Sequence, residues 1–250
     1  MLPTLLVVAA LAAATPLECR QAPPGRKVVL AELFSSEGCD SCPPAERVFN
    51  NLQPAPEVVP LVWHTDYFDG PGWKDRFALA ESTRRQLELA QAQGGKTIVA
   101  TPQVFIDGKA FADWRDARAL RSRVLRNAAE APPLTLTLPR IEQAGDALQV
   151  TIEVGGSLSP NAVQWQAAWT QSELSSQVTG GENKGLTLQH RHVVRAGTGA
   201  LQGTAARSIA MRLPLPDPPP AGEIGVVVWA QDGGARTLAA TWALCHMQGS

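Results

Sequence analysis

The stretch of sequence that decides the fold, residues 27–44, reads KVVLAELFSSEGCDSCPP. Residues 28–34 form an apolar run rich in β-branched side chains, which is typical of a buried strand. The small polar residues and the glycine at 35–38 end that strand. Two prolines follow the second cysteine, and proline is tolerated in the first turn of a helix because the N–H that it lacks has no partner there. The stretch therefore predicts a strand, a short loop, a C-x-x-C motif and a helix.

The two cysteines of this motif, Cys39 and Cys42, are the strongest chemical signal in the chain. The predicted helix begins at or just after Cys39, where free N–H groups and the helix dipole stabilise a thiolate. A C-x-x-C motif between a buried strand and a helix is the arrangement of thioredoxin-type redox sites. We expect Cys39 to be the exposed, attacking thiolate and Cys42 to resolve the mixed disulfide. The alternative is an inert structural disulfide.

Composition places the chain among soluble globular proteins. Of its 250 residues, 44% are hydrophobic and 18% are charged. The net charge of -1 argues against a nucleic-acid partner. Residues 2–14 are apolar, too short to span a bilayer comfortably, and end in three alanines, so residues 1–14 are predicted to be a secretory signal peptide. We therefore expect a periplasmic or secreted protein without a membrane span after cleavage, in a compartment that favours disulfides.

The pattern of apolar and polar residues along the chain changes at Pro132-Pro133. Before this point, apolar runs alternate with amphipathic helical patterns; after it, short alternating runs are separated by turn residues. The sequence predicts an α/β thioredoxin-like domain over residues 15–131, followed by an all-β sandwich domain over residues 134–246. The first domain is expected to hold strands 28–34, 57–64, 103–106 and 109–112, with helices after Cys42, from Asp75 to about 93, and from Asp113. The second is expected to hold strands 134–138, 147–154, 163–170, 186–194, 208–213, 224–230 and 238–244.

Short motifs are spread over both halves. They are ELFSSEGCDSCPPA at 32–45, WHTDY at 63–67, GWKD at 72–75, RQ at 85–86, TPQ at 101–103, GEN at 181–183 and VVR at 193–195. In these motifs the chain resembles bacterial secreted proteins, mostly of unknown function, that join a thioredoxin-like domain to a β-sandwich. The likeness covers nearly all of the mature chain. Thr65 and Ala100 depart from the aliphatic and the aromatic residue expected at their positions.

The resemblance implies roles for three residues near the cysteines. Pro102 is expected to be a cis-proline that faces the cysteine pair, and the backbone of Thr101 to hold an extended peptide substrate. Similar folds place a buried carboxylate beneath the active site, which implies that Glu32 relays protons during disulfide exchange. The alternatives are an ordinary loop proline at 102 and an outward-facing acid at 32.

Histidines supply a second set of candidates. His64 and Asp66 follow the second predicted strand, at the sheet edge where ligands bind in open α/β folds. We expect them to contact the substrate, or simply to anchor their loop by hydrogen bonds. A redox-tuning or metal-binding role is a further alternative for this pair. His190 and His192 are interpreted as surface residues.

The other two cysteines, Cys19 and Cys245, are predicted to form a structural disulfide, since pairing Cys39 with Cys42 leaves only this combination. We expect no cofactor and no resident metal, because two cysteines make an incomplete zinc site. The predicted function is thiol–disulfide exchange with protein thiols or disulfides. The alternatives are a copper-binding or chaperone module that uses the cysteine thiols, and a non-catalytic binding protein with a structural disulfide. The sequence leaves the oligomeric state open.

Overall fold

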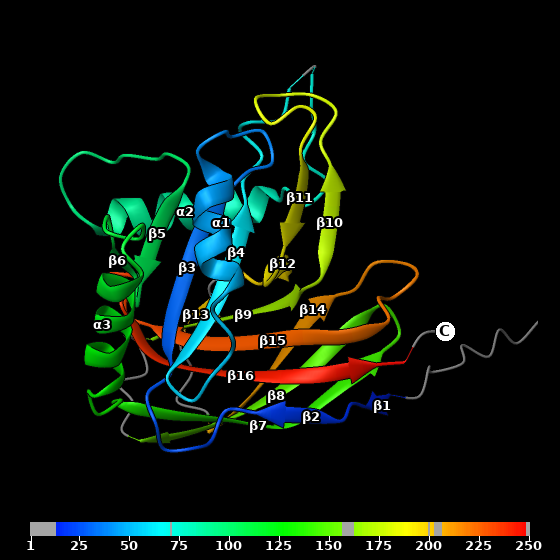
Figure 1. The fold of residues 1–250 in the computed structure, drawn as a ribbon. Helices are drawn as coiled ribbons and strands as arrows, with labels where there is room; N and C mark the ends of the chain where they lie inside the picture. Colours follow the sequence, from blue (N-terminus) through cyan, green and yellow to red (C-terminus); the bar gives the residue numbers. More distant parts are fainter. Residues whose placement is uncertain (1–13, 71, 157–162, 200, 203–206, 249–250) are drawn as a thin grey trace, which may run out of the picture.

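The computed structural model describes residues 14–248, except residues 71, 157–162, 200 and 203–206. Within these ranges three helices accompany a much larger number of strands, so the protein is mostly β (Figure 1). No helix in the described part is both long and apolar enough to cross a membrane. The predicted signal peptide, residues 1–14, lies outside the described residues except for its last residue, Ala14.

One large sheet runs through most of the molecule. The two halves of the chain meet where Val193 lies opposite Val62 in a parallel pair, and the Val62 N–H donates to the His192 carbonyl at 2.9 Å. Its strands follow the spatial order β2 (Cys19–Gln21), β16 (Thr237–Met247), β15 (Gly222–Gln231), β9 (Gln164–Gln171), β12 (Val193–Gly197), β4 (Val58–His64), β3 (Val29–Ser35), β5 (Gln103–Ile106) and β6 (Lys109–Ala110), with β13 (Leu201–Gln202) also paired to β9.

A second sheet packs against the part of the large sheet that comes from the second half. It has the order β1 (Thr15–Pro16), β7 (Leu134–Ala144), β8 (Ala147–Gly156) and β14 (Ser208–Pro214). Every second residue of β8 faces inward, as strand geometry requires. Leu148, Val150 and Ile152 are fully buried there, in one cluster with Trp165 and Trp169 of β9. These two sheets therefore form a sandwich around an apolar core.

The helices cover the two faces of β3. Val29, Ala31 and Leu33 pack against α1 (Cys42–Asn50) and α3 (Ala117–Ala128). Leu30 and Phe34 point to the other face, which α2 (Ala80–Ala92) covers through Leu89. Both faces of β3 are thus buried, which explains why its sequence is a continuous apolar run rather than an alternating one.

A two-stranded hairpin, β10 (Leu174–Gln177) with β11 (Thr187–His190), extends from the sandwich alongside α1 (Figure 1). Asn50, the last residue of α1, holds the end of the hairpin. Its side-chain amide donates to the Gln189 carbonyl at 2.9 Å, and its side-chain oxygen accepts from the Arg191 N–H at 3.1 Å. The hairpin therefore brings residues of the second half of the chain against the helix that carries the C-x-x-C motif.

The predicted fold class, an α/β thioredoxin-like domain followed by an all-β sandwich domain, is wrong. The described chain is mostly β, and the strands that the prediction divides between two domains hydrogen-bond into one sheet through β12 and β4. An exposed edge on β4 is covered in this way, because β12 satisfies backbone groups that would otherwise be unpaired. The boundaries 15–131 and 134–246 stay a prediction, which limited proteolysis can test.

Several element boundaries also differ from the prediction. The second helix begins at Ala80 and not at Asp75, whose carboxylate accepts from the N–H groups of Glu37 and Phe77, at 2.8 Å each. The third helix begins at Ala117, because Asp116 and not Asp113 caps it by accepting from the first free N–H groups. The strand expected over 186–194 is split between β11 and β12 at His192, which has a φ of 57°.

A disulfide joins Cys19 to Cys245, the pairing predicted by elimination. The two residues lie opposite each other in the antiparallel pair of β2 and β16. The N-terminal segment of the described chain is thereby attached covalently to the last strand.

Candidate functional site

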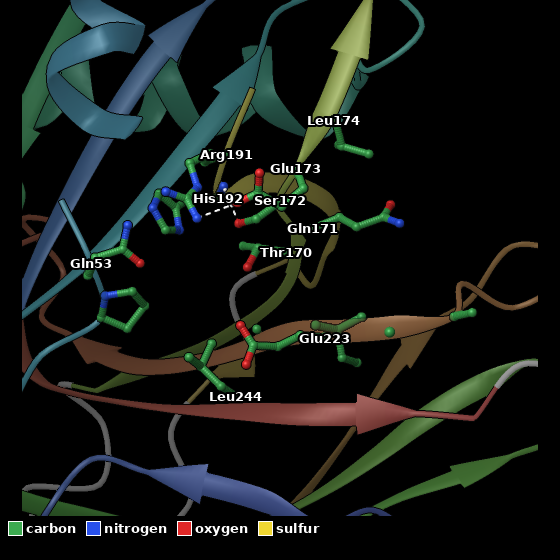
Figure 2. A pocket seen from close by; sticks show the side chains of 15 residues that line it. Gln53, Thr170, Gln171, Ser172, Glu173, Leu174, Arg191, His192, Glu223 and Leu244 are labelled. Carbon is green, nitrogen blue, oxygen red and sulfur yellow. Dashed lines mark hydrogen bonds and ion pairs between the residues drawn. The ribbon is translucent and has the colours of Figure 1, made fainter. Parts of the chain in front are cut away.

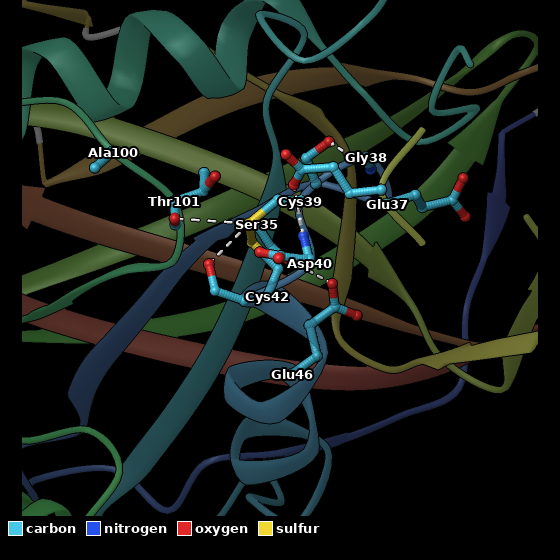
Figure 3. The surroundings of a disulfide bond; sticks show 12 residues. Ser35, Glu37, Gly38, Cys39, Asp40, Cys42, Glu46, Ala100 and Thr101 are labelled. Atoms are coloured by element: carbon cyan, nitrogen blue, oxygen red, sulfur yellow. Dashed lines mark hydrogen bonds between the residues drawn. A yellow bond between two sulfur atoms is a disulfide. The ribbon is translucent and has the colours of Figure 1, made fainter. Parts of the chain in front are cut away.

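The Cys39–Cys42 disulfide lies at the N-terminus of α1 (Figure 3). Cys42 is the first residue of the helix, and its N–H donates to the Cys39 carbonyl at 3.2 Å. The Cys39 sulfur lies 3.4 Å from the Ser41 hydroxyl and 3.6 Å from the Thr101 carbonyl oxygen. The Thr101–Pro102 peptide bond is cis. The structure therefore brings together four residues that the sequence singled out, namely Cys39, Cys42, Thr101 and Pro102.

Cys39 is not the exposed residue that the sequence predicted. Its exposed fraction is 2%, and that of Cys42 is 0%. A loop from the second half of the chain covers the motif, because the Asn183 amide donates to the carbonyls of Glu37 and Cys39 at 2.9 and 2.8 Å. The same loop also packs against the loop that precedes Asp75, so closely that a Cβ added at Gly180 would overlap the Gly72 carbonyl oxygen. Attack on the disulfide thus requires the covering segments to move.

Aromatic residues lie at the surface next to this cover. Tyr67 and Phe68 are exposed, and their rings lie 5.4 Å apart. A Cβ added at Gly38 would come within 3.3 Å of the Phe68 Cβ, so Phe68 borders the C-x-x-C loop directly. Ile98, three residues before Thr101, is also exposed. Exposed apolar side chains therefore border the loop that carries the C-x-x-C motif.

Behind the disulfide lies a buried cluster of charged and polar side chains. Glu46 follows Cys42 by one turn of α1, and its carboxylate lies 2.5 Å from the His190 Nδ1. His64, at the end of β4, forms a 2.7 Å hydrogen bond from Nδ1 to Asp75. The His190 Nε2 lies 3.2 Å from a carboxylate oxygen of Glu37, without the geometry of a hydrogen bond. All five side chains are buried.

The charged groups in this cluster shift one another's pKa values. Burial disfavours a charged imidazole, but the neighbouring carboxylates of Glu37 and Glu46 raise the pKa of His190 to about 9. Burial also opposes charge on His64, yet Asp75 raises the pKa of that histidine above its usual value. For Glu46, burial is outweighed by the hydrogen bond with His190 and by the nearby His64, so its pKa is lowered. The cluster therefore attracts positive charge into the interior.

The structure does not bring Glu32 to the cysteines. Glu32 is fully buried on the face of β3 that α2 covers, and α1 lies on the opposite face. Both of its carboxylate oxygens accept from the Arg85 guanidinium at 2.9 Å, and one also accepts from the Trp63 ring N–H at 3.2 Å. Glu32 is therefore part of a bidentate ion pair between β3 and α2.

The remaining residues considered in the sequence, Asp66, His190 and His192, have different surroundings. Asp66 accepts from the Thr83 hydroxyl at 2.5 Å and thereby fixes its loop to α2. His190 and His192, interpreted as surface residues, are both buried. The His192 Nε2 donates to the Leu52 carbonyl at 2.7 Å, and burial lowers its pKa to about 4. The surface interpretation is wrong because the hairpin folds back onto α1.

Sequence reasoning missed most of the buried cluster. Glu46 carried a usable signal, since it follows Cys42 by four residues and so shares its face of the helix. Asp75 and Asn183 belong to the GWKD and GEN motifs, but nothing in the sequence linked these motifs to the cysteines, because the contacts join distant elements. His190 carried no signal as a functional residue.

A model of one protein family matches residues 30–231 of the chain, and it is described as "Protein of unknown function (DUF1223)". The chain belongs to the DUF1223 family. No curated protein matches the sequence.

Two solved structures share the fold of this family member. Protein AGR_C_4864 from Agrobacterium tumefaciens is 21% identical, with a TM-score of 0.61, over 89% of this chain and 96% of the other. HBP35 of Porphyromonas gingivalis is 13% identical, with a TM-score of 0.60, over 87% of this chain and 74% of the other. At these identities the likeness concerns the fold alone.

A separate pocket lies between the start of the β10–β11 hairpin and the large sheet (Figure 2). Its volume is about 390 Å³, and Glu173, Arg191 and Glu223 supply charged groups to its wall. The His192 N–H donates to the Ser172 hydroxyl at 3.0 Å on one side of it. Neither cysteine of the C-x-x-C motif lines this pocket, so it does not belong to the disulfide site.

Proposed function

We propose that this protein is an exported thiol–disulfide oxidoreductase that acts through Cys39 and Cys42 on thiols or disulfides of other proteins. The observation that carries the proposal is the position of the Cys39–Cys42 disulfide at the N-terminus of α1. Unpaired N–H groups and the helix dipole favour a thiolate at that position, and the thiolate is the form of cysteine that reacts.

The exchange reaction needs only the two cysteines and a partner disulfide. In the reduced protein the Cys39 thiolate attacks one sulfur of the partner, and the other partner sulfur leaves as a thiolate. The Cys42 thiolate then attacks the Cys39 sulfur of the mixed disulfide. This step forms the Cys39–Cys42 bond, releases the second partner thiolate and transfers two electrons to the partner in total.

Features around the motif support a polypeptide as the partner. The Thr101 carbonyl beside the Cys39 sulfur can accept a hydrogen bond from an extended chain. The exposed rings of Tyr67 and Phe68 offer apolar contact next to it. Export is supported by the second disulfide, Cys19–Cys245, because such bonds persist in the periplasm and outside the cell.

A second candidate is a binding protein in which the Cys39–Cys42 bond is purely structural. The burial of both cysteines favours this alternative, since a disulfide out of reach of solvent exchanges slowly. The two candidates differ in whether a partner thiol reaches the Cys39 sulfur.

Trapping of mixed disulfides distinguishes the two functions. A Cys42→Ala variant, incubated with an unfolded protein that contains a disulfide, is expected to form a covalent adduct that reductant releases. The matched Cys39→Ala variant is expected to form few adducts, because Cys42 lies inside the first turn of α1. Far-UV circular dichroism checks that both variants fold. Equal trapping by the two variants, or none by either, would rule out the oxidoreductase and leave the structural disulfide.

A further inference from the structure

The buried cluster behind the disulfide has the composition of a metal site. Glu46, His64 and His190 each offer a ligand atom, and these atoms all lie within 4.8 Å of one another. The three residues come from α1, β4 and β11, so elements from both halves of the chain converge on one point. All three are buried, and the site is thereby shielded from water.

His64 is oriented as a metal ligand. Its Nδ1 lies 2.7 Å from the Asp75 carboxylate, which fixes the proton on that nitrogen. Its Nε2 then carries a lone pair, and this buried atom has no hydrogen-bond partner among the described residues. The Nε2 lies 3.9 Å from a Glu46 oxygen, a separation that one ion can bridge. A histidine held by a carboxylate on one nitrogen, with the other nitrogen free, is the usual form of a zinc ligand.

His190 has a carboxylate on each side of its ring. Its Nδ1 lies 2.5 Å from Glu46, and its Nε2 lies 3.2 Å from Glu37. A neutral imidazole that turns its N–H towards Glu37 presents a lone pair to the Glu46 oxygen. The Nδ1 and the Glu46 oxygen would then both be acceptors, and two acceptors this close need a cation between them, which is either a proton or a metal ion.

Charge balance points the same way. The cluster contains three buried carboxylates, those of Glu37, Glu46 and Asp75. In the described part of the chain, no Lys or Arg side chain forms an ion pair with any of them, and both Glu37 oxygens are without a hydrogen-bond partner. Buried carboxylates require a compensating cation, which is here either the protons on His64 and His190 or a divalent metal ion bound in their place.

We propose that Glu46, His64 and His190 bind a divalent transition-metal ion of the zinc type. Two imidazole nitrogens and one carboxylate are ligands that Zn²⁺ accepts, with one position left open. Asp75 orients His64 from outside the ligand set, and the Glu37 carboxylate lies 3.2 Å from the His190 Nε2 on the side away from Glu46. Loading separates the His190 Nδ1 from the Glu46 oxygen by a few tenths of an ångström, since two ligands of one zinc ion lie about 3 Å apart. The cysteines of the C-x-x-C motif are not ligands.

Binding of Zn²⁺ and Co²⁺ to the full chain tests the proposal. The protein is stripped with a chelator, kept with both disulfides oxidised, and either titrated directly or refolded with the metal. Calorimetry is expected to give one equivalent of Zn²⁺. Co²⁺ is expected to show visible ligand-field bands without the charge-transfer band of a thiolate ligand.

Variants identify the ligands. Glu46→Gln and His64→Ala are expected to abolish stoichiometric binding, and Asp75→Asn to weaken it by about 10–100-fold. His246→Ala, which removes an exposed histidine, is the matched control and is expected to bind like the wild type. Where a ligand variant does not fold, the Co²⁺ spectrum of the wild type decides between nitrogen–oxygen and sulfur ligands. The proposal is overturned if the wild type binds no metal after refolding, if Glu46→Gln and His64→Ala bind as tightly as the wild type, or if Co²⁺ shows thiolate ligation.

Discussion

At Glu32, for which the sequence predicts a proton relay, the structure shows a buried ion pair. Its partner Arg85 is almost fully buried, and without the Glu32 carboxylate the guanidinium keeps, among the described residues, only a carboxylate partner at the protein surface, Glu88 at 3.0 Å, which is 35% exposed. Breaking one side of such a pair is strongly destabilising. Glu32→Gln is expected to lower the free energy of unfolding by about 3–5 kcal/mol, measured by urea denaturation.

Glu81→Gln is the matched control for this variant. Glu81 also pairs with an arginine of α2, Arg84, but both side chains are exposed, so we expect a loss of less than about 1 kcal/mol. Similar losses in the two variants would contradict the importance assigned to burial. If Glu32→Gln instead lost disulfide exchange at unchanged stability, the result would support the predicted role of Glu32 as a proton relay.

Asp107 gives the stability of the protein a dependence on pH. Burial raises the pKa of this carboxyl above its usual 3.8, against the effect of Lys27 and of the hydrogen bonds from Leu30 and Asn127. Above pH 3.8 Asp107 is ionised in the unfolded chain but still protonated in the folded protein. The free energy of unfolding therefore falls as the pH rises towards the folded pKa of Asp107, and then levels off.

Asp107→Asn is expected to remove this fall. Asparagine tolerates the φ of 50° at this position, and Lys27 keeps Glu130 as a partner at 2.7 Å. Urea denaturation of both proteins between about pH 3 and 7 measures the difference. Curves that stay parallel over this range would show that the ionisation of Asp107 does not contribute.

At the residue scale, the sequence identified chemistry that lies within a few positions along the chain. The Cys39–Cys42 pair and the pairing of Cys19 with Cys245 follow from spacing and elimination. His190 does not, because its alternation with His192 on a short polar strand resembles an exposed edge. Only the contact of the hairpin with α1 buries it.

At the scale of elements, we expect the loop around Asn183 to limit access to the disulfide that it covers. Asn183→Ala removes two hydrogen bonds to buried carbonyls, which we expect to cost about 1–3 kcal/mol in stability. Residues 36–42 should then exchange their amide hydrogens faster, and a small thiol should reduce Cys39–Cys42 faster. Lys184→Ala, at the exposed neighbouring position, is the control and should change neither rate. An unchanged reduction rate in Asn183→Ala would show that other segments limit access.

Most strands and the start of α1 could be predicted from the sequence, while the starts of α2 and α3 could not. Every strand expected after residue 134 has a counterpart, because alternating apolar residues mark a half-buried strand. The start of α2 was misplaced because Asp75 is a good capping residue by type, whereas the residue at the N-cap position, Leu79, is not; the contacts of Asp75 with Glu37 and His64 decide its role. The β10 strand was missed because its residues, LSSQ, have no strand periodicity.

At the scale of the whole molecule, the segment between the two halves is expected to be cut without separating them. Residues 129–133 lie outside the helices and strands, and the sequence places a boundary here. Proteolysis near Pro132 should give fragments that stay together in gel filtration even after reduction, because the large sheet crosses the cut. Separation of the fragments under native reducing conditions would show that the halves fold independently.

The join between the halves was beyond sequence reasoning. It rests on a parallel pair of β4 and β12, whose residues Val62 and Val193 are far apart in the chain and carry no mutual signal. A composition change at Pro132-Pro133 looks the same whether the next strands form their own domain or extend an existing sheet.

The Cys19–Cys245 bond makes the described protein a closed ring in covalent terms. Because the bond connects the two ends, new termini can be opened elsewhere without releasing either end of the fold. The turn at Gly233-Gly234 between β15 and β16 is a suitable place, since a Cβ there meets no backbone. A circular permutant opened at this turn, with a short linker between residues 19 and 245, would keep the ring's geometry without requiring an oxidising environment.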